Sequence, residues 1–203
     1  MAWESILEKH PKHVHAIGMI SIENANLEIA LANLMATVLF MPQHVSHAIF
    51  FTPRASALRL QILRESAKAH LVTPSKSKHP LHVQKREALK KIEKLINRCF
   101  NAIDKRHTFI HESWGVFGEK DENVSRQDPS DWHGKDKDYE PVSLQSLNDL
   151  VRDFRLLIDE VHKLTREFKR HPPSMADMKS DTKSGLPTTV EAQSRRKPSS
   201  AKN

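Results

Sequence analysis

The sequence contains little glycine, few aromatic residues and almost no cysteine. Five of its 203 residues are glycine, one is cysteine, and aromatic residues make up 6%. Scarce glycine, beside abundant Leu, Ile, Ala, Lys, Arg and Glu, favours a helical body over strands. Cys99 has no disulfide partner within the chain and lies on an apolar helical stripe. It is therefore predicted to be a buried core thiol in a reducing compartment.

Common catalytic and metal-binding signatures are also missing. The chain has no Gly-rich phosphate loop, no HExxH, no cysteine pair and no GxSxG, which removes the usual nucleotide, zinc and serine-hydrolase motifs. His10, His13 and His15 lie close together, but the stretch HPKHVH holds no cysteine or carboxylate beside them. We therefore predict no metal site and no cofactor.

Long hydrophobic runs are absent as well. The most apolar stretch, IALANLMATVLFM at 29–41, is too short to span a bilayer and is typical of a core helix. The N-terminal residues carry charges throughout and lack the apolar centre of a secretory signal. These features predict a soluble, cytoplasmic protein with no membrane partner.

Positive charge is in excess, with a formal net charge of +7. Residues 1–117 carry sixteen Lys and Arg against nine Asp and Glu, whereas 118–141 carry eight acids against four bases. A basic helical body fits a polyanionic partner such as RNA, although this charge alone is weak evidence.

The apolar residues repeat with a helical period in several segments. Pro42 ends the first of them, Thr52 and Pro53 are the predicted N-cap and first residue of the next, and Ser143 is the predicted N-cap of the last. Short connections predict an all-α, antiparallel bundle of four to five helices. The predicted helices are 14–41, a short helix at 43–51, 52–71, a long helix from about 81 or 84 to 113, and 142–170.

Two segments lack this period. Residues 118–141 are acidic and rich in turn formers, and are predicted to be a long structureless insertion before the last helix. Residues 172–203 are polar and rich in Ser, Thr, Lys and Pro, which predicts a disordered basic tail. The helical domain is then 1–171.

The stretch KRHTFIHESWG, 105–115, contains the strongest functional candidate. Arg106 occupies a step of the apolar stripe of the long central helix, where an unpaired charge is costly. His107 and His111 are one helical turn apart, beside it. Arginine suits phosphate, and histidine exchanges protons near neutral pH. These are the groups that cleavage of an RNA strand needs in the absence of a metal ion.

In these residues the chain resembles the HEPN superfamily, all-α domains that carry Arg, four to six residues and then His late in a helix, usually with a polar residue after the Arg. Arg106, His107 and His111 match the three positions, and the resemblance covers about residues 14–171. It implies a metal-independent endoribonuclease, typically a homodimer in which two motifs face each other. In that case His111 is the base, Arg106 stabilises the phosphorane, and His107 orients or donates. Four other Arg–His pairs in the chain have similar spacing, but none lies at the end of a central helix.

Two interpretations remain open. In the first the protein cleaves or binds RNA as a toxin or defence component, with a protein antitoxin as a further partner and the acidic insertion acting as a lid or a substrate mimic. In the second it is a non-catalytic interaction or nucleotide-binding module that acts as a dimer, and Arg106 pairs with a carboxylate of another helix. The candidate carboxylates are Glu23, Glu28 and Glu65.

Three further residues are candidates for substrate binding. Asn24 and Glu28 are one turn apart and are predicted to line the same cleft as Arg106, although a polar contact that closes the bundle is equally compatible. Trp114 follows the motif and could stack on a base, but an aromatic residue that continues an apolar stripe is more often in a core or a dimer interface.

Overall fold

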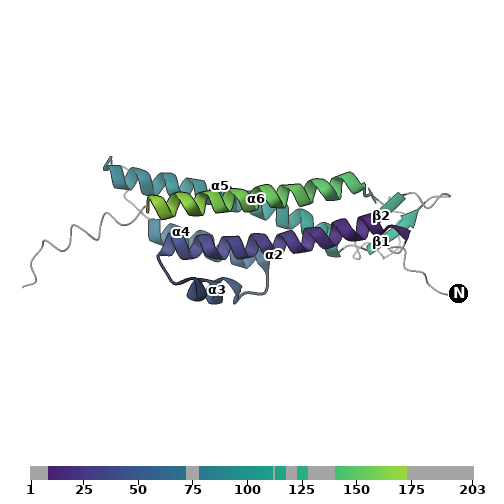
Figure 1. The fold of residues 1–203 in the computed structure, drawn as a ribbon, viewed down its shortest axis with the longest axis horizontal. Coiled ribbons are helices and arrows are strands. Elements are labelled where there is room, and N and C mark those ends of the chain that lie inside the picture. Colours follow the sequence, from purple (N-terminus) through teal and green to yellow (C-terminus); the bar gives the residue numbers. More distant parts are fainter. Residues whose placement is uncertain (1–8, 72–77, 112, 118–122, 128–139, 173–203) are drawn as a thin grey trace, which may run out of the picture.

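The computed structural model describes residues 9–71, 78–111, 113–117, 123–127 and 140–172, and between residues 111 and 140 it describes the backbone only. In these ranges the chain forms five helices and one small three-stranded sheet (Figure 1). The predicted all-α bundle is confirmed. The predicted tail lies outside the described residues, apart from Pro172.

The first two helices follow the local signals in the sequence. α2 spans Pro11–Leu39, so it begins and ends a few residues earlier than the predicted 14–41, and α3 spans Gln43–Phe51, directly after Pro42. Between them Phe40 adopts the left-handed conformation, with φ 52°, and the Met41 N–H donates to the Ala36 carbonyl at 3.1 Å. This closes α2 and turns the chain back along it.

α4 spans Ser56–Leu71, so the predicted start at Thr52 and Pro53 is wrong. The Thr52 hydroxyl donates to the Ala48 carbonyl at 2.7 Å, and its N–H donates to Ile49. Thr52 therefore closes α3 instead of opening α4. The local pattern fits either role, and the contacts of α3 decide between them.

α5 spans Pro80–His111 and leads into the sheet. β1, Ser113–Phe117, pairs antiparallel with β2, Asn123–Gln127, which pairs antiparallel with β3, Glu140–Pro141. Two predictions are corrected here: the helix does not extend to 113, and the 118–141 insertion is not wholly structureless. A glycine at 115 disfavours further helix, and Val116 and Phe117 favour a strand. The rest of the insertion lies outside the described residues.

α6 spans Leu144–Arg170. The Ser143 hydroxyl accepts a hydrogen bond from the Ser146 N–H at 3.0 Å, which confirms the predicted N-cap. The helix ends at His171, immediately before Pro172.

Consecutive helices reverse direction, so the first and last long helices run parallel. Arg155 of α6 bonds Glu23 of α2, and farther along the same two helices His162 and Asn33 line one hollow. α5 runs against α6, because Lys91 pairs with Glu167 and Arg98 pairs with Glu160. α3 lies on the side of α2 away from α5 and α6 (Figure 1).

One hydrophobic core joins all the helices. Phe50, Phe154, Leu27 and Leu31 are among its fully buried side chains. Cys99 belongs to this core and is fully buried, and burial raises the pKa of its thiol to about 12. The predicted core thiol is confirmed. No helix of the described residues is long and apolar enough to cross a membrane.

Candidate functional site

Arg106 lies on the buried face of α5, near its C-terminal end. The buried face runs through Ile92, Cys99 and Ala102, and four residues after Ala102 it reaches Arg106, which is half-buried. The Arg106 Nε hydrogen is buried and has no hydrogen-bond partner. A buried donor without a partner is costly, so its presence needs an explanation.

The three carboxylates considered as partners for Arg106 are all bonded elsewhere. Glu28 accepts hydrogen bonds from the Ser56 hydroxyl and from Arg59 Nη1, each at 2.5 Å. Within the described residues neither Glu28 nor any other carboxylate forms an ion pair with Arg106. Glu28 instead holds the first turn of α4 against α2, where an anion is favourable.

Glu23 and Glu65 are likewise engaged. Arg155 Nε donates to Glu23 Oε1 at 2.7 Å, and this hydrogen bond lowers the pKa of the Glu23 carboxyl against the opposing effect of burial. Lys68 pairs with Glu65 at 3.1 Å, one turn away on the surface of α4. Among the described residues, the guanidinium of Arg106 is thus left without a counter-ion.

Asn24 lies at about the same level of the bundle as Arg106. Lys105 of α5 and Asp153 of α6 line one hollow of about 240 Å³, and Arg155, two residues farther along α6, bonds Glu23. Asn24 is 5% exposed, and its Oδ1 is buried without a hydrogen-bond partner. Near the middle of α2, the bundle therefore holds an unsatisfied acceptor on α2 and an unsatisfied donor on α5.

The two motif histidines follow Arg106 on the same helix. His107 is exposed, and His111 is the last residue of α5, one turn later. The side chains of His111 and Trp114 lie outside the described residues. The backbone of Trp114 is in β1, opposite Arg126 of β2. The small sheet thus begins within two residues of the motif.

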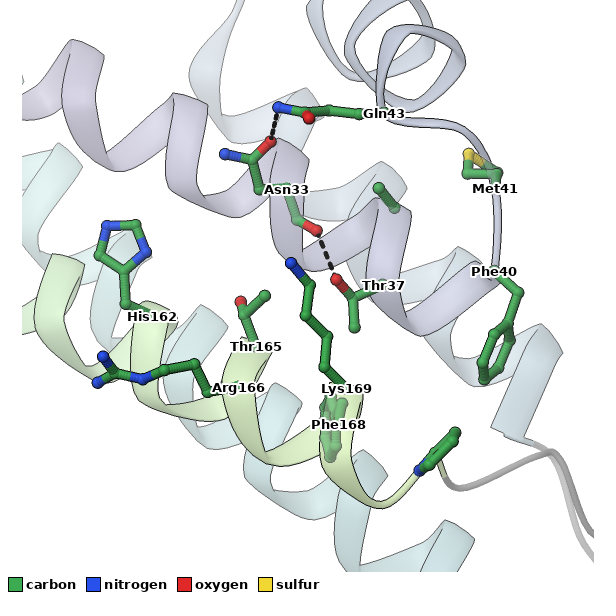
Figure 2. Close-up of a pocket in the computed structure, with 12 residues that line it drawn as sticks. Asn33, Thr37, Phe40, Met41, Gln43, His162, Thr165, Arg166, Phe168 and Lys169 are labelled. Atoms are coloured by element: carbon green, nitrogen blue, oxygen red, sulfur yellow. Dashed lines mark hydrogen bonds between the residues drawn. The ribbon is translucent and has the colours of Figure 1, made fainter.

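A larger hollow lies at the end of the bundle where α2 and α6 both end. It has a volume of about 690 Å³. Figure 2 shows Lys169 reaching from α6 toward Thr37 of α2, while Arg166 points away from it. None of the described residues that line this hollow carries a carboxylate. The C-terminal ends of two parallel helices attract cations, which accounts for these basic residues without a ligand.

Other histidine clusters offer little for a metal ion. The rings of His10 and His13 meet edge to face, with centroids 5.7 Å apart. In the part of the chain that the structure describes, no three His, Cys, Asp or Glu residues are placed to hold a metal ion together.

Comparisons with protein-family models, with curated proteins and with solved structures give no match. The function is therefore inferred from the chemistry of the site. An arginine without a counter-ion, a buried amide oxygen and histidines one turn apart suit a ligand that carries negative charge and exchangeable protons.

Proposed function

We propose that the protein is a HEPN-like RNA-binding protein that cleaves RNA without a metal ion, as a toxin or defence component that acts as a homodimer. The observation that carries the proposal is the half-buried guanidinium of Arg106, whose Nε has no partner while Glu23 and Glu28 bind other arginines. A phosphate would satisfy both the charge and the buried donor.

The groups around Arg106 have the chemistry of strand cleavage. His111 would remove the proton of a 2′-hydroxyl as its oxygen attacks the adjacent phosphorus. The bond from phosphorus to the 5′-oxygen then breaks, and that oxygen takes up a proton, from His107 or from water. The products are a 2′,3′-cyclic phosphate and a 5′-hydroxyl. Arg106 would stabilise the charge that develops on the phosphorane, an effect on the order of 10²–10³-fold. A general base contributes about 10²–10⁴-fold.

Arg106 offers a test that separates function from folding. Replacing a charge that lacks a buried partner with an apolar side chain of similar length should not destabilise the protein. Arg106→Met should therefore change the free energy of unfolding by less than ~1 kcal/mol, or increase it, while abolishing cleavage. Stability is measured by urea denaturation.

The decisive experiment incubates purified protein with a mixed RNA pool in excess EDTA. Wild type should leave cyclic phosphate ends, and Arg106→Met and His111→Ala should not. His162→Ala, which removes an exposed histidine of α6 far along the bundle, is the matched control and should cut as wild type does. No cleavage by wild type, or a large loss of stability in Arg106→Met, would contradict the proposal.

A further inference from the structure

The hollow of about 690 Å³ at the C-terminal ends of α2 and α6 is open and only partly polar. Phe40 and Phe168 are among its apolar walls, and Figure 2 shows Lys169 reaching across it from α6. A second hollow, of about 520 Å³, adjoins the first, because Asn33 and His162 line both. The space between the two helices is therefore large enough for several side chains of another segment.

Phe40 is an exposed aromatic residue at the edge of this hollow. Its side chain meets the ring of His70, with centroids 5.8 Å apart, and the residue is still 44% exposed. Its φ of 52° is uncommon for a bulky residue, and helices that end in this conformation usually have glycine or asparagine there. A strained aromatic side chain that lines a hollow favours contact with a further apolar group.

Two cations at the hollow lack a counter-ion. Arg166 and Lys169 both line it and are exposed, and neither forms an ion pair with any of the described residues. Arg155, farther from the end of the same helix, differs from them because it bonds Glu23 of α2. The hollow therefore suits a segment that carries both apolar and acidic side chains.

The chain leaves the helical bundle at this hollow. Pro172 lines it, and a second proline follows in the sequence, which disfavours any further helix. The charges of the residues after Pro172 are unevenly distributed. Residues 173–181, PSMADMKSD, contain two acids and one base, whereas 182–203 contain one acid and five bases. The acidic part of this sequence is thus the part that follows the hollow directly.

Residues 173–181 have the chemistry that the hollow requires. Met175 and Met178 are two of the six methionines of the chain, and methionine fills irregular apolar spaces well. Asp177 and Asp181 are carboxylates, which the described walls of the hollow lack. Nine residues can extend over roughly 30 Å, and the hollow follows α6 for only about 15 Å, so the segment is long enough to turn back along it.

We infer that residues 173–181 dock into this hollow of their own chain, with the two methionines against its aromatic walls and the two aspartates beside Arg166 and Lys169. The docking site is separate from the candidate RNA site. Lys91 of α5 pairs with Glu167 near the hollow, and Arg106 lies fifteen residues after Lys91, about 22 Å farther along α5. The inference therefore does not depend on RNA chemistry at Arg106.

Oxidation of methionine by hydrogen peroxide tests the contact in the full chain. Met175 and Met178 should react about tenfold more slowly in wild type than in a free peptide of residues 171–183, as expected for a segment that is docked about 90% of the time. Peptide mass spectrometry measures both rates. Arg166→Glu/Lys169→Glu should bring them close to the rates of the free peptide, because the two aspartates would then face carboxylates.

The chain provides a matched control for this charge reversal. Lys163 and Arg170 are exposed on the same helix but do not line the hollow, so Lys163→Glu/Arg170→Glu makes the same change in net charge and should leave the methionines protected. Asp177→Lys/Asp181→Lys should release the segment, and combining it with the reversal of the two cations at the hollow should restore protection. Far-UV circular dichroism and thermal denaturation would verify that each variant is folded.

Cysteine cross-linking tests the position of the segment independently. Cys99 is fully buried and its thiol pKa is about 12, so introduced cysteines react alone. Under mild oxidation Thr37→Cys/Met178→Cys should form a disulfide within one chain, because Thr37 lines the hollow. Lys94→Cys/Met178→Cys is the control and should not, because Lys94 is exposed on α5 and does not line the hollow.

Several results would overturn the inference. They are methionine oxidation in wild type as fast as in the free peptide, protection that survives Arg166→Glu/Lys169→Glu, and equal cross-linking to Thr37→Cys and Lys94→Cys. A yield of cross-linked dimer that rises with protein concentration would also overturn it, because the hollow would then hold the segment of a second copy. Each of these results leaves the RNA-cleavage assay unaffected.

Discussion

α2 and α6 run parallel and pack on each other along their length, yet their sequences differ sharply. α2 has three charged residues in 29 positions, Lys12, Glu23 and Glu28, and α6 has eleven in 27. Both helices bury one side in the same core. In α6 the charges lie on the remaining surface, so the helix has one buried apolar side and one charged side that faces solvent. In α2 the remaining surface carries almost no charge, and α3 covers only the part nearest its C-terminus.

Charge has a different role in each helix. Glu28 of α2 has a side chain only 9% exposed and holds α4 in place, with Arg59 also lying over the Phe51 ring. Glu160 of α6 pairs with Arg98 on the surface, with its side chain 38% exposed. The α6 side chains that pair with other helices, Arg155, Glu160 and Glu167, are all more exposed than Glu28.

The largest expected effects on stability come from the hydrophobic core that both helices share. Leu27 of α2 and Phe154 of α6 are both fully buried. Leu27→Ala should lower the free energy of unfolding by roughly 2–5 kcal/mol and Phe154→Ala by roughly 3–5 kcal/mol, because each leaves a cavity. Urea denaturation monitored by circular dichroism measures both. A large loss in one helix and a small loss in the other would mean that they do not share a single core.

The next largest effect on stability comes from removing one charged residue of each helix. Glu28→Gln leaves Arg59 without its counter-ion in a largely buried position and should lower the free energy of unfolding by about 2–3 kcal/mol. Glu160→Gln breaks an exposed pair and should cost less than about 1 kcal/mol. The same denaturation experiment compares them, and equal losses would remove the distinction between buried and solvated charge.

Local signals in the sequence predicted much of the fold. Pro42, Ser143 and the apolar periods gave the ends of α3 and α6, because caps and breakers act within a few residues. The failures also have local causes. Thr52 fits either end of a helix, and the strands after α5 are too short and irregular to stand out from a loop.

Only part of the candidate site could be predicted from the sequence. The place of Arg106 on an apolar stripe could be read from its spacing, and the structure finds it half-buried there. Its neighbours could not be read in the same way. Glu23 bonds a residue 132 positions away, and Glu28 bonds one 31 positions away, so the choice of partner depends on which helices meet. The spacing of charges along one helix carries no such information.

A smaller effect is expected on the open side of α2. Gly18→Ala adds a methyl group where nothing lies within 4 Å and should raise the free energy of unfolding of the monomer by roughly 0.5–1 kcal/mol. Urea denaturation measures this change. A Gly18→Ala protein that is less stable than wild type would contradict the open space that the structure shows at this position.

The smallest effect concerns the two ends of α2 in mild acid. Burial lowers the pKa of His13, against a hydrogen bond with the Val142 backbone that raises it. Burial also lowers the pKa of His70, whose ring lies 5.8 Å from that of Phe40, and the charge of Lys85 adds to this effect. Above the ordinary value of 6.5 both imidazoles are neutral in the folded and unfolded chain. Below it the unfolded chain takes up protons first, so stability falls as the pH drops.

Thermal denaturation between pH 8 and pH 5.5 would measure this loss. The Glu23 carboxyl, whose pKa is lowered, stays ionised over that range and does not contribute. In the double variant His13→Gln/His70→Gln, Tm should depend less on pH than in wild type. The difference in Tm between the two proteins should stay below the ~2–4 °C that 1 kcal/mol produces in a domain of this size. Each single variant should remove part of the slope. An unchanged slope in the double variant would mean that other groups cause the acid loss, and that the ends of α2 are held equally well at both pH values.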